Sequence, residues 1–231
     1  MIQAITFTNF GYIDFTLNLL ESINKNNIDL PLKIYCTDDR SYSYLLKKGY
    51  DAELLENRLI ISENIVSWKA GQGEFGKLMI NKFMSINSAL KNNKHVLYLD
   101  GDVVVKQNLQ EYLIDYLRDD DFLFQLDYNP KKIIQDELCA GFMLIKSSLK
   151  TIELFNINNI NLEELVKLPS HDQTFLNQNK KNFNYKFLSS HKFPNGAYFS
   201  NFITNPYAIH FNYFIGSKKK KIMKKYGEWY I

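Results

Sequence analysis

Hydrophobic and polar positions follow two different periods along the chain. Short apolar runs rich in β-branched and aromatic residues predict strands buried on both faces of a sheet. Longer segments with apolar residues at helical spacing predict helices between them. The predicted strands are 3–8, 32–37, 51–55, 95–99, 122–127 and 138–145, and the predicted helices are 12–26, 41–50, 74–93, 108–117, 171–179 and 217–226.

Strands that alternate with helices predict an α/β fold, with a Rossmann-like, mainly parallel sheet flanked by helices. The chain shows no internal repeat and no low-complexity linker, so we expect a single domain over residues 1–231. The stretch from Arg58 to Gly76 is the least regular, and loops of this length are commonly functional. In such sheets, ligands bind beyond the carboxyl ends of the strands.

Polar residues follow three of the predicted strands at that edge of the sheet. Thr8 and Asn9 follow the first strand, Asp38 follows the second, and Asp100-Gly101-Asp102 follows the fourth. An unpaired buried carboxylate is costly, so the two aspartates after the apolar run should meet a positive partner. That partner is a side chain or a metal ion, unless a turn exposes both acids to water.

Three interpretations of Asp100-Gly101-Asp102 stay open at this point. Asp-Gly between β-rich runs is typical of a hairpin turn, although the continuous apolar run before it favours a strand buried on both faces. A phosphatase of the haloacid dehalogenase type also carries Asp-x-Asp after a strand, but there the motif opens the domain. The third interpretation is a divalent cation site for a nucleotide diphosphate, because Mg²⁺ and Mn²⁺ favour carboxylate and phosphate oxygens.

Composition narrows the class of protein. The 231 residues are 45% hydrophobic, enough to fill a core, and 28 basic against 25 acidic residues argue against a nucleic-acid partner. Two distant cysteines, Cys36 and Cys139, form neither a disulfide framework nor a zinc set, which indicates a reducing compartment. No signal peptide and no apolar run long enough for a transmembrane segment is visible. We therefore expect a cytoplasmic protein.

Four segments, in this order, resemble the GT-A glycosyltransferases, which use an Asp-x-Asp motif to hold Mn²⁺ and a nucleotide sugar. They are LMINKFMSINSALKNNKHVLYLDGDVVV, ELCAGFMLIKSS, SHDQTFLNQ and IHFNYFIGSKKKKIMKKYGEW, and the similarity extends from Ala4 to Trp229. The resemblance implies a GT-A fold and a hexosyltransferase-type enzyme. It would move a sugar from a nucleotide-sugar donor to a glycan, protein or small-molecule acceptor.

The resemblance also implies where the ion and the diphosphate bind. Asp100, Asp102 and His210 match the ligands of Mn²⁺ (or Mg²⁺), whereas the sequence without the resemblance favours a core or turn histidine at position 210. Gly216 and Lys219 match the diphosphate grip, because glycine lets the backbone approach oxygens and lysine supplies a point charge. Lys220 is a second candidate to turn inward, and the remaining lysines of this segment are expected on a solvated helix face.

Further residues are expected around the donor. Lys82 is expected to point at the phosphates or at sugar-binding acids, with an exposed helix lysine as the alternative. Asp172 and Gln173 are expected to bind the sugar and take part in catalysis, with Ser170 as helix cap and Asp172 in the first turn as the alternative. The other expected binding residues are Thr8, Asn9 and Tyr12 at the nucleobase, Asp38 at the base or ribose unless it caps a helix, and Gly101, Ala140 and Gly141.

One departure from the family pattern bears on the donor sugar. Many relatives carry asparagine, which contacts the sugar, where this chain has Cys139. A UDP-sugar is favoured as donor, with a GDP-sugar as the alternative. The resemblance implies transfer with retention, whereas an inverting enzyme would need a carboxylate such as Asp172 or Asp127 as base.

Two other functions remain alternatives. One is a nucleotidyltransferase of sugar phosphates, although the residues after the first strand lack the Gly-rich basic loop that such enzymes carry. The other is a non-catalytic nucleotide-sugar binder.

Overall fold

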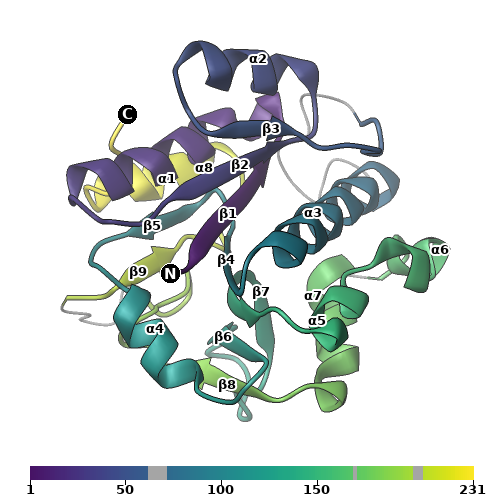
Figure 1. The fold of residues 1–231 in the computed structure, drawn as a ribbon. Helices are drawn as coiled ribbons and strands as arrows, with labels where there is room; N and C mark the ends of the chain where they lie inside the picture. Colours follow the sequence, from purple (N-terminus) through teal and green to yellow (C-terminus); the bar gives the residue numbers. More distant parts are fainter. Residues whose placement is uncertain (62–71, 169–170, 200–204) are drawn as a thin grey trace.

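The computed structural model describes residues 1–61, 72–168, 171–199 and 205–231, and it contains a seven-stranded sheet beside a two-stranded one (Figure 1). The strands are β1 (Gln3–Thr8), β2 (Leu32–Cys36), β3 (Ala52–Leu54), β4 (His95–Leu99), β5 (Val103–Val105), β6 (Phe122–Leu126), β7 (Leu138–Lys146), β8 (Tyr185–Leu188) and β9 (Ala208–His210). The α-helices are α1 (Ile13–Lys25), α2 (Asp39–Lys47), α3 (Gln72–Asn92), α4 (Gln110–Leu117), α5 (Leu149–Leu154), α6 (Leu162–Leu165), α7 (His171–Asn179) and α8 (Ser217–Lys225). None of the helices in these residues is long and apolar enough to cross a membrane.

The large sheet has the order β3-β2-β1-β4-β7-β6-β8. The pairings from β3 to β4 and between β6 and β8 are parallel, whereas β7 is antiparallel to both β4 and β6. Residues 127–137 join β6 to β7 without a helix, and such a direct connection leaves the second strand antiparallel. The predicted mainly parallel sheet flanked by helices is therefore confirmed.

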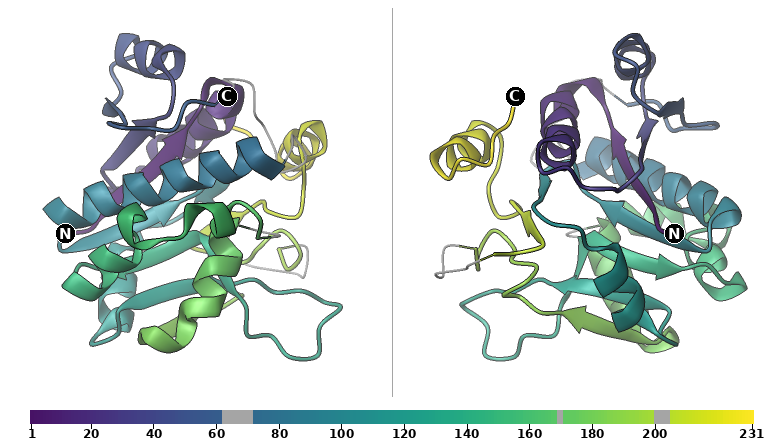
Figure 2. Two further views of the ribbon diagram at one scale, coloured as in Figure 1. Left: turned by 90° about the vertical axis from the view of Figure 1, so that its right-hand side faces the viewer. Right: turned by 60° about the vertical axis from the view of Figure 1, so that its left-hand side comes forward.

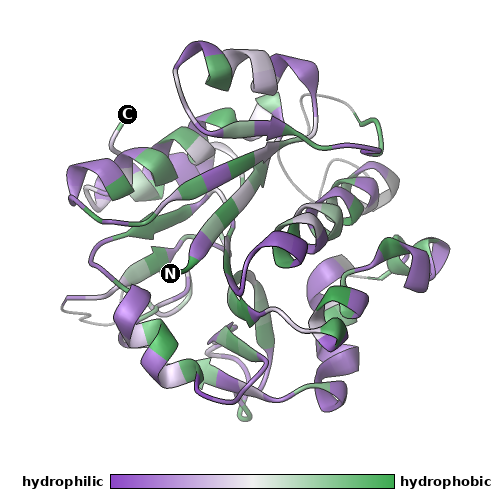
Figure 3. Ribbon diagram, viewed as in Figure 1, coloured by the Kyte–Doolittle hydropathy of each residue, from purple (hydrophilic) through white to green (hydrophobic). Residues whose placement is uncertain are grey.

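Alternation of side chains along the strands divides the core into two layers. Ala4 and Leu97 face one layer, packed with residues of α1, α2 and α4. Their neighbours Ile5 and Tyr98 face the other, packed with residues of α3, α5 and α7. Successive residues of a strand point to opposite faces, so the central strands β1 and β4 contribute to both layers. Figure 3 shows hydrophobic residues along the strands and a mixed pattern on the helices.

The C-terminal part of the chain folds back beside α1, where Figure 2 shows α8 in yellow. Phe15 of α1, Val104 of β5, Ile209 of β9 and Met223 of α8 form a separate hydrophobic cluster. The side chain of Asn18 bonds the backbone of residues beyond α8, donating to Glu228 O and accepting from Tyr230 N. This packing fixes the small sheet and α8 against the body of the protein.

The hairpin interpretation of Asp100-Gly101-Asp102 is wrong. β4 pairs with β1 and β7 in the large sheet, whereas β5 pairs with β9 in the small one. A turn with Val103 N bonded to Asp100 O separates the two strands. The chain leaves the large sheet at this turn, so both aspartates lie where two sheets meet.

Several short elements were not predicted from the sequence: β5, β8, β9, α5 and α6. Three- or four-residue strands are too short to show a period, although the cap of α5 is readable, since Ser148 and Thr151 form a capping box. Helix α3 begins at Gln72, two residues before the predicted start, and occupies the end of the irregular stretch. Residues 62–71 of that stretch lie outside the described residues.

Candidate active site

A cavity of about 680 Å³ lies beyond the carboxyl ends of β1 and β4. The chain runs from β1 toward β3 on one side and resumes at β4 on the other, so this is the switch point of the sheet. The expected site residues that line the cavity are Thr8, Asn9, Tyr12, Lys82, Asp100, Gly101, Asp102, Ala140, Gly141, Asp172, Gln173, His210, Gly216 and Lys219.

Asp38 is the expected residue that is not among those lining the cavity. Its Oδ1 accepts from Ser41 N at 2.7 Å, which caps α2, and its Oδ2 accepts from Phe10 N at 2.9 Å. Both carboxylate oxygens thus hold backbone groups. The structure supports the capping alternative, in which Asp38 orders the turn that follows β1.

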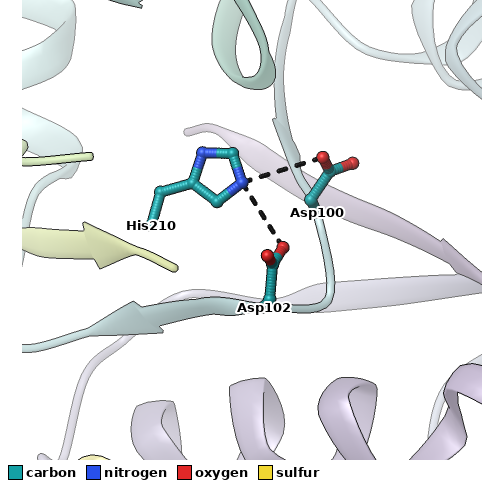
Figure 4. A group of neighbouring side chains, drawn as sticks. All are labelled: Asp100, Asp102 and His210. Atoms are coloured by element: carbon teal, nitrogen blue, oxygen red, sulfur yellow. Dashed lines mark ion pairs between the residues drawn. The ribbon is translucent and has the colours of Figure 1, made fainter. Parts of the chain in front are cut away.

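Asp100, Asp102 and His210 meet at the wall of the cavity (Figure 4). His210 Nε2 lies 3.3 Å from Asp102 Oδ1 and 3.8 Å from Asp100 Oδ2, and one ligand atom of each residue lies within 4.8 Å of the others. The β5–β9 ladder causes this approach, because it pairs Val103 directly with His210. Residues far apart in sequence are thereby held as one cluster.

The second oxygen of each carboxylate is held by another side chain. Asp100 Oδ1 accepts from Tyr98 OH at 2.6 Å and from Lys82 Nζ at 3.3 Å. Asp102 Oδ2 accepts from Lys219 Nζ at 2.5 Å. Two carboxylate oxygens and one imidazole nitrogen therefore converge, a donor set that fits Mn²⁺ or Mg²⁺ and would leave coordination positions for phosphate oxygens.

Opposite charges within the cluster stabilise one another. Burial would lower the pKa of His210, but Asp102 raises it well above its usual range. Burial would raise the pKa of Asp102, but Lys219 and His210 hold it far below its usual range. A bound divalent cation would take over the charge of the imidazolium proton, because metal ligands bind in their deprotonated form.

Lys82 reaches the cavity from inside the core, so the exposed-lysine alternative is wrong. The residue is 1% exposed, and its Nζ donates to Asp172 Oδ2 at 2.6 Å and to Ala140 O at 2.8 Å. Burial would lower the pKa of Lys82, but Asp100 and Asp172 outweigh it and raise the pKa. The ammonium group thus links the two acids across the cavity wall.

The first turn of α7 places Asp172 and Gln173 in the cavity. Gln173 Nε2 donates to Asp127 Oδ2 at 2.9 Å, and Asp127 Oδ1 also accepts from Asn195 and Asn212. Ser170, the expected cap, lies outside the described residues. The start of α7 is therefore tied to the end of β6 by side-chain amides.

Two glycines are required by the geometry at the cavity. A Cβ at Gly141 would lie 2.2 Å from His210 Cε1 and 2.5 Å from Asp100 Oδ2, so any side chain would collide with the acid–histidine cluster. Gly216 has φ +55° at the start of α8, a conformation that favours glycine. In the first turn of α8, Lys219 Nζ donates to Tyr12 OH at 2.9 Å, and the Tyr12 ring packs on Phe15.

Some residues of the site were not found from the sequence. Gln125 contacts His210, Tyr98 contacts Asp100, and the apolar side chains Phe75, Leu78 and Met79 of α3 line the cavity. Gln125 could have been identified from the sequence, since it is a polar residue that interrupts the apolar run of β6. The apolar residues of α3 could not have been identified in this way, because their spacing is that of any helix that faces a core.

Comparisons with known proteins agree with this geometry. Residues 32–224 match the family model described as nucleotide-diphospho-sugar transferase. The chain is 28% identical over 289 residues to the UDP-galactose:fucoside alpha-3-galactosyltransferase of Dictyostelium discoideum, an alignment that covers 99% of this chain and 43% of that protein.

Solved structures show the same fold. The galactosyltransferase LgtC, in complex with donor and acceptor sugar analogs, has a TM-score of 0.60 at 14% identity, covering 92% of this chain and 87% of that one. The glycosyltransferase GlyE of Streptococcus pneumoniae TIGR4 has a TM-score of 0.57 at 16% identity, covering 98% of this chain and 60% of that one. The predicted GT-A fold is thus confirmed, in a chain that spans only part of two of these relatives.

Proposed function

The chain belongs to the nucleotide-diphospho-sugar transferase family, and from this premise we propose that it is a metal-dependent glycosyltransferase that uses a UDP-sugar. The observation that carries the proposal is the convergence of Asp100, Asp102 and His210 at a cavity of about 680 Å³. The cavity is large enough for a nucleotide sugar, and its wall carries both a cation site and lysines.

The residues at the cluster have separate tasks in this proposal. Asp100, Asp102 and His210 would hold Mn²⁺ or Mg²⁺, and an ion bound there would supply positive charge to offset the charge that builds on the departing diphosphate. Lys219 and the backbone at Gly216, at the N-terminus of α8, bind phosphate oxygens. Lys219 now contacts Asp102, so it exchanges a carboxylate partner for a phosphate when the donor enters.

Two observations support the proposed donor: the residues that line the cavity and the name of a relative. Thr8, Asn9 and Tyr12 lie at the end of β1, on the side of the cavity proposed for the nucleobase. The Dictyostelium relative is named for UDP-galactose, which supports uridine over guanosine. Cys139 lies in the cavity wall, at the position where the family resemblance implies an asparagine, so we propose that it selects among donor sugars.

We propose transfer with retention of configuration, because the carboxylates near the sugar side are already occupied. Asp172 is ion-paired with the buried Lys82. Asp127 accepts from the amides of Gln173, Asn195 and Asn212. Such acids suit electrostatic support of an oxocarbenium-like centre, with Asp172 and Gln173 beside it, better than removal of a proton from the acceptor.

The test is incubation of the purified protein with a panel of nucleotide sugars and Mn²⁺. We expect release of UDP from one UDP-sugar, stopped by EDTA and restored by added Mn²⁺. Conversion of a nucleoside triphosphate and a sugar phosphate into a nucleotide sugar would instead identify a nucleotidyltransferase. Binding of a nucleotide sugar without any turnover, with every acceptor class supplied, would identify a binder.

Two broader proposals accompany the activity. We propose that residues 1–231 act as one catalytic domain, since residues of the large sheet, the small sheet and α8 line one cavity. We also propose a cytoplasmic location, supported by two free, buried cysteines, Cys36 and Cys139.

A further inference from the structure

We infer that Gln125 is a positioning residue that fixes the tautomer and the ring orientation of His210. Gln125 lies on β6 and is 1% exposed, and its Oε1 is 2.8 Å from His210 Nδ1. His210 Nε2, on the other side of the ring, faces Asp100 and Asp102. One nitrogen is thus held by the amide, and the other is left for the acids and a cation.

The orientation of the Gln125 amide follows from its other partners. Gln125 Nε2 donates to Phe193 O at 3.1 Å and to Pro194 O at 3.0 Å. Both partners are carbonyls, which only accept, so the reversed amide would place three oxygens together. The amide oxygen must therefore face His210, and it can be satisfied there only by an Nδ1–H group.

The ring and its backbone are anchored to the same segment. His210 N donates to Pro194 O at 3.0 Å, the carbonyl that also accepts from Gln125. Cys139 Sγ lies 3.5 Å from the same Nδ1 and gives a second, weaker contact. The bonds restrict both the position of the Cα atom and the rotation of the imidazole.

Fixing Nδ1–H has a consequence for cation binding. When the ring is neutral, the proton on Nδ1 leaves the lone pair on Nε2, directed between the two carboxylates. The other tautomer would point an N–H group at the cation. Partners of this kind on metal-ligating histidines typically affect metal affinity by about 10- to 100-fold. The identity of the ion rests on the proposed function, but the Nδ1–H bond exists without it.

The first test needs no substitution of Gln125. In the metal-free protein labelled with ¹⁵N-histidine, His210 should show an Nδ1–H resonance that exchanges slowly with water, assigned by its loss in His210→Asn. In the Mg²⁺-loaded protein, Nδ1 should remain protonated while the shift of Nε2 moves. An unprotonated His210 Nδ1 in the Mg²⁺-loaded protein would overturn the inference.

The second test removes the acceptor. Gln125→Leu keeps similar volume, and we expect at least about 10-fold faster exchange of the Nδ1 proton and about 10- to 100-fold weaker Mn²⁺ binding by calorimetry. Gln107→Leu is the matched control, because Gln107 Nε2 also donates to backbone carbonyls, at Asn205 and Pro206, away from the cavity. Unchanged proton exchange in folded Gln125→Leu would contradict the inference.

The outcomes separate this inference from the proposed function. Wild-type protein that binds Mn²⁺ but releases no UDP would refute the transferase and leave the role of Gln125 intact. Wild-type protein that binds no Mn²⁺ would refute the cation site, while the exchange of the Nδ1 proton in the metal-free protein still decides the role of Gln125. If Gln125→Leu does not fold, the measurement on the wild-type ring decides it alone.

Discussion

The ammonium group of Lys82 donates to Asp172 Oδ2 at 2.6 Å, joining α3 to the start of α7 inside the protein. The same group lies 3.3 Å from Asp100 Oδ1, so a single cation connects the acid–histidine cluster to the residues proposed to face the sugar. Breaking this link leaves two acids without their shared counter-charge. Stability and assembly of the site are therefore coupled at Lys82.

Replacing Lys82 with methionine should destabilise the protein by about 3–5 kcal/mol, because removal of one partner leaves a buried charge uncompensated. Urea unfolding followed by circular dichroism measures this change. Lys77→Met is the control, since Lys77 is on the same helix and its side chain is 48% exposed in a pair with Glu74. Equal midpoints for the two variants would contradict the buried ion pair.

Replacing Asp102 with asparagine should remove the response to Mn²⁺. At about 100 times the dissociation constant, Mn²⁺ should stabilise the wild-type protein by about 2.7 kcal/mol, or roughly 5–10 °C in Tm. Differential scanning fluorimetry with and without EDTA gives this shift. Asp119→Asn, at an exposed aspartate after α4, should keep it. A shift that persists in the Asp102 variant would place the ion elsewhere.

Replacing Gly141 with alanine should block the cation site without a general loss of structure. The added methyl group would collide with His210 and Asp100, and overpacking of this kind costs about 1–3 kcal/mol. Gly49→Ala is the control, because φ +79° at Gly49 imposes a backbone cost of about 1–2 kcal/mol where no atom lies near the new Cβ. Both variants should lose stability, but only Gly141→Ala should lose the Mn²⁺ shift.

The thiols should be unreactive in the folded protein. Burial raises the pKa of the Cys36 thiol to about 12, so only about one molecule in ten thousand carries the thiolate at pH 8. Burial also raises the pKa of Cys139. Titration with a chromogenic disulfide should detect two thiols in urea and neither, on the scale of minutes, in buffer. Rapid reaction of the native protein would show that one of these side chains is accessible.

Transfer should retain the configuration of the donor. Proton NMR of the product at the anomeric position, taken early in the reaction, distinguishes the two outcomes. Asp127→Asn should keep most of the rate, because Asp127 mainly receives amide hydrogen bonds and is not used as a base in a retaining transfer. An inverted product together with an inactive Asp127 variant would assign that carboxylate as the general base.

The sequence predicted the parts of the protein that are governed by local pattern. Hydrophobic period and residue type predict most strands of the large sheet and the longer helices. The polar residues after β1 and β4 were identified as site residues because ligands bind beyond the carboxyl ends of such strands. The hairpin alternative was open because Asp-Gly is compatible with a tight turn. The long-range pairings of β4 with β1 and β7, and of β5 with β9, exclude it.

The remaining features depend on tertiary contacts. Lys82 is indistinguishable from a surface lysine until Asp172 is placed beside it. The sequence was compatible with two roles for Asp38, binding of the base or ribose and capping of a helix. Its hydrogen bonds with Ser41 and Phe10 support the cap. Gln125 was visible as a polar residue in an apolar strand, but its partner lies on a strand too short to predict.

The small β5–β9 sheet determines when the cluster is assembled during synthesis. The ribosome delivers Asp100 and Asp102 long before His210 and Lys219, and the nascent chain carries both acids without these two partners. Only after β9 has emerged does Val103 gain its partner strand, and with it the histidine. Competence to capture a cation through all three ligands therefore arises only after the chain has been made through β9.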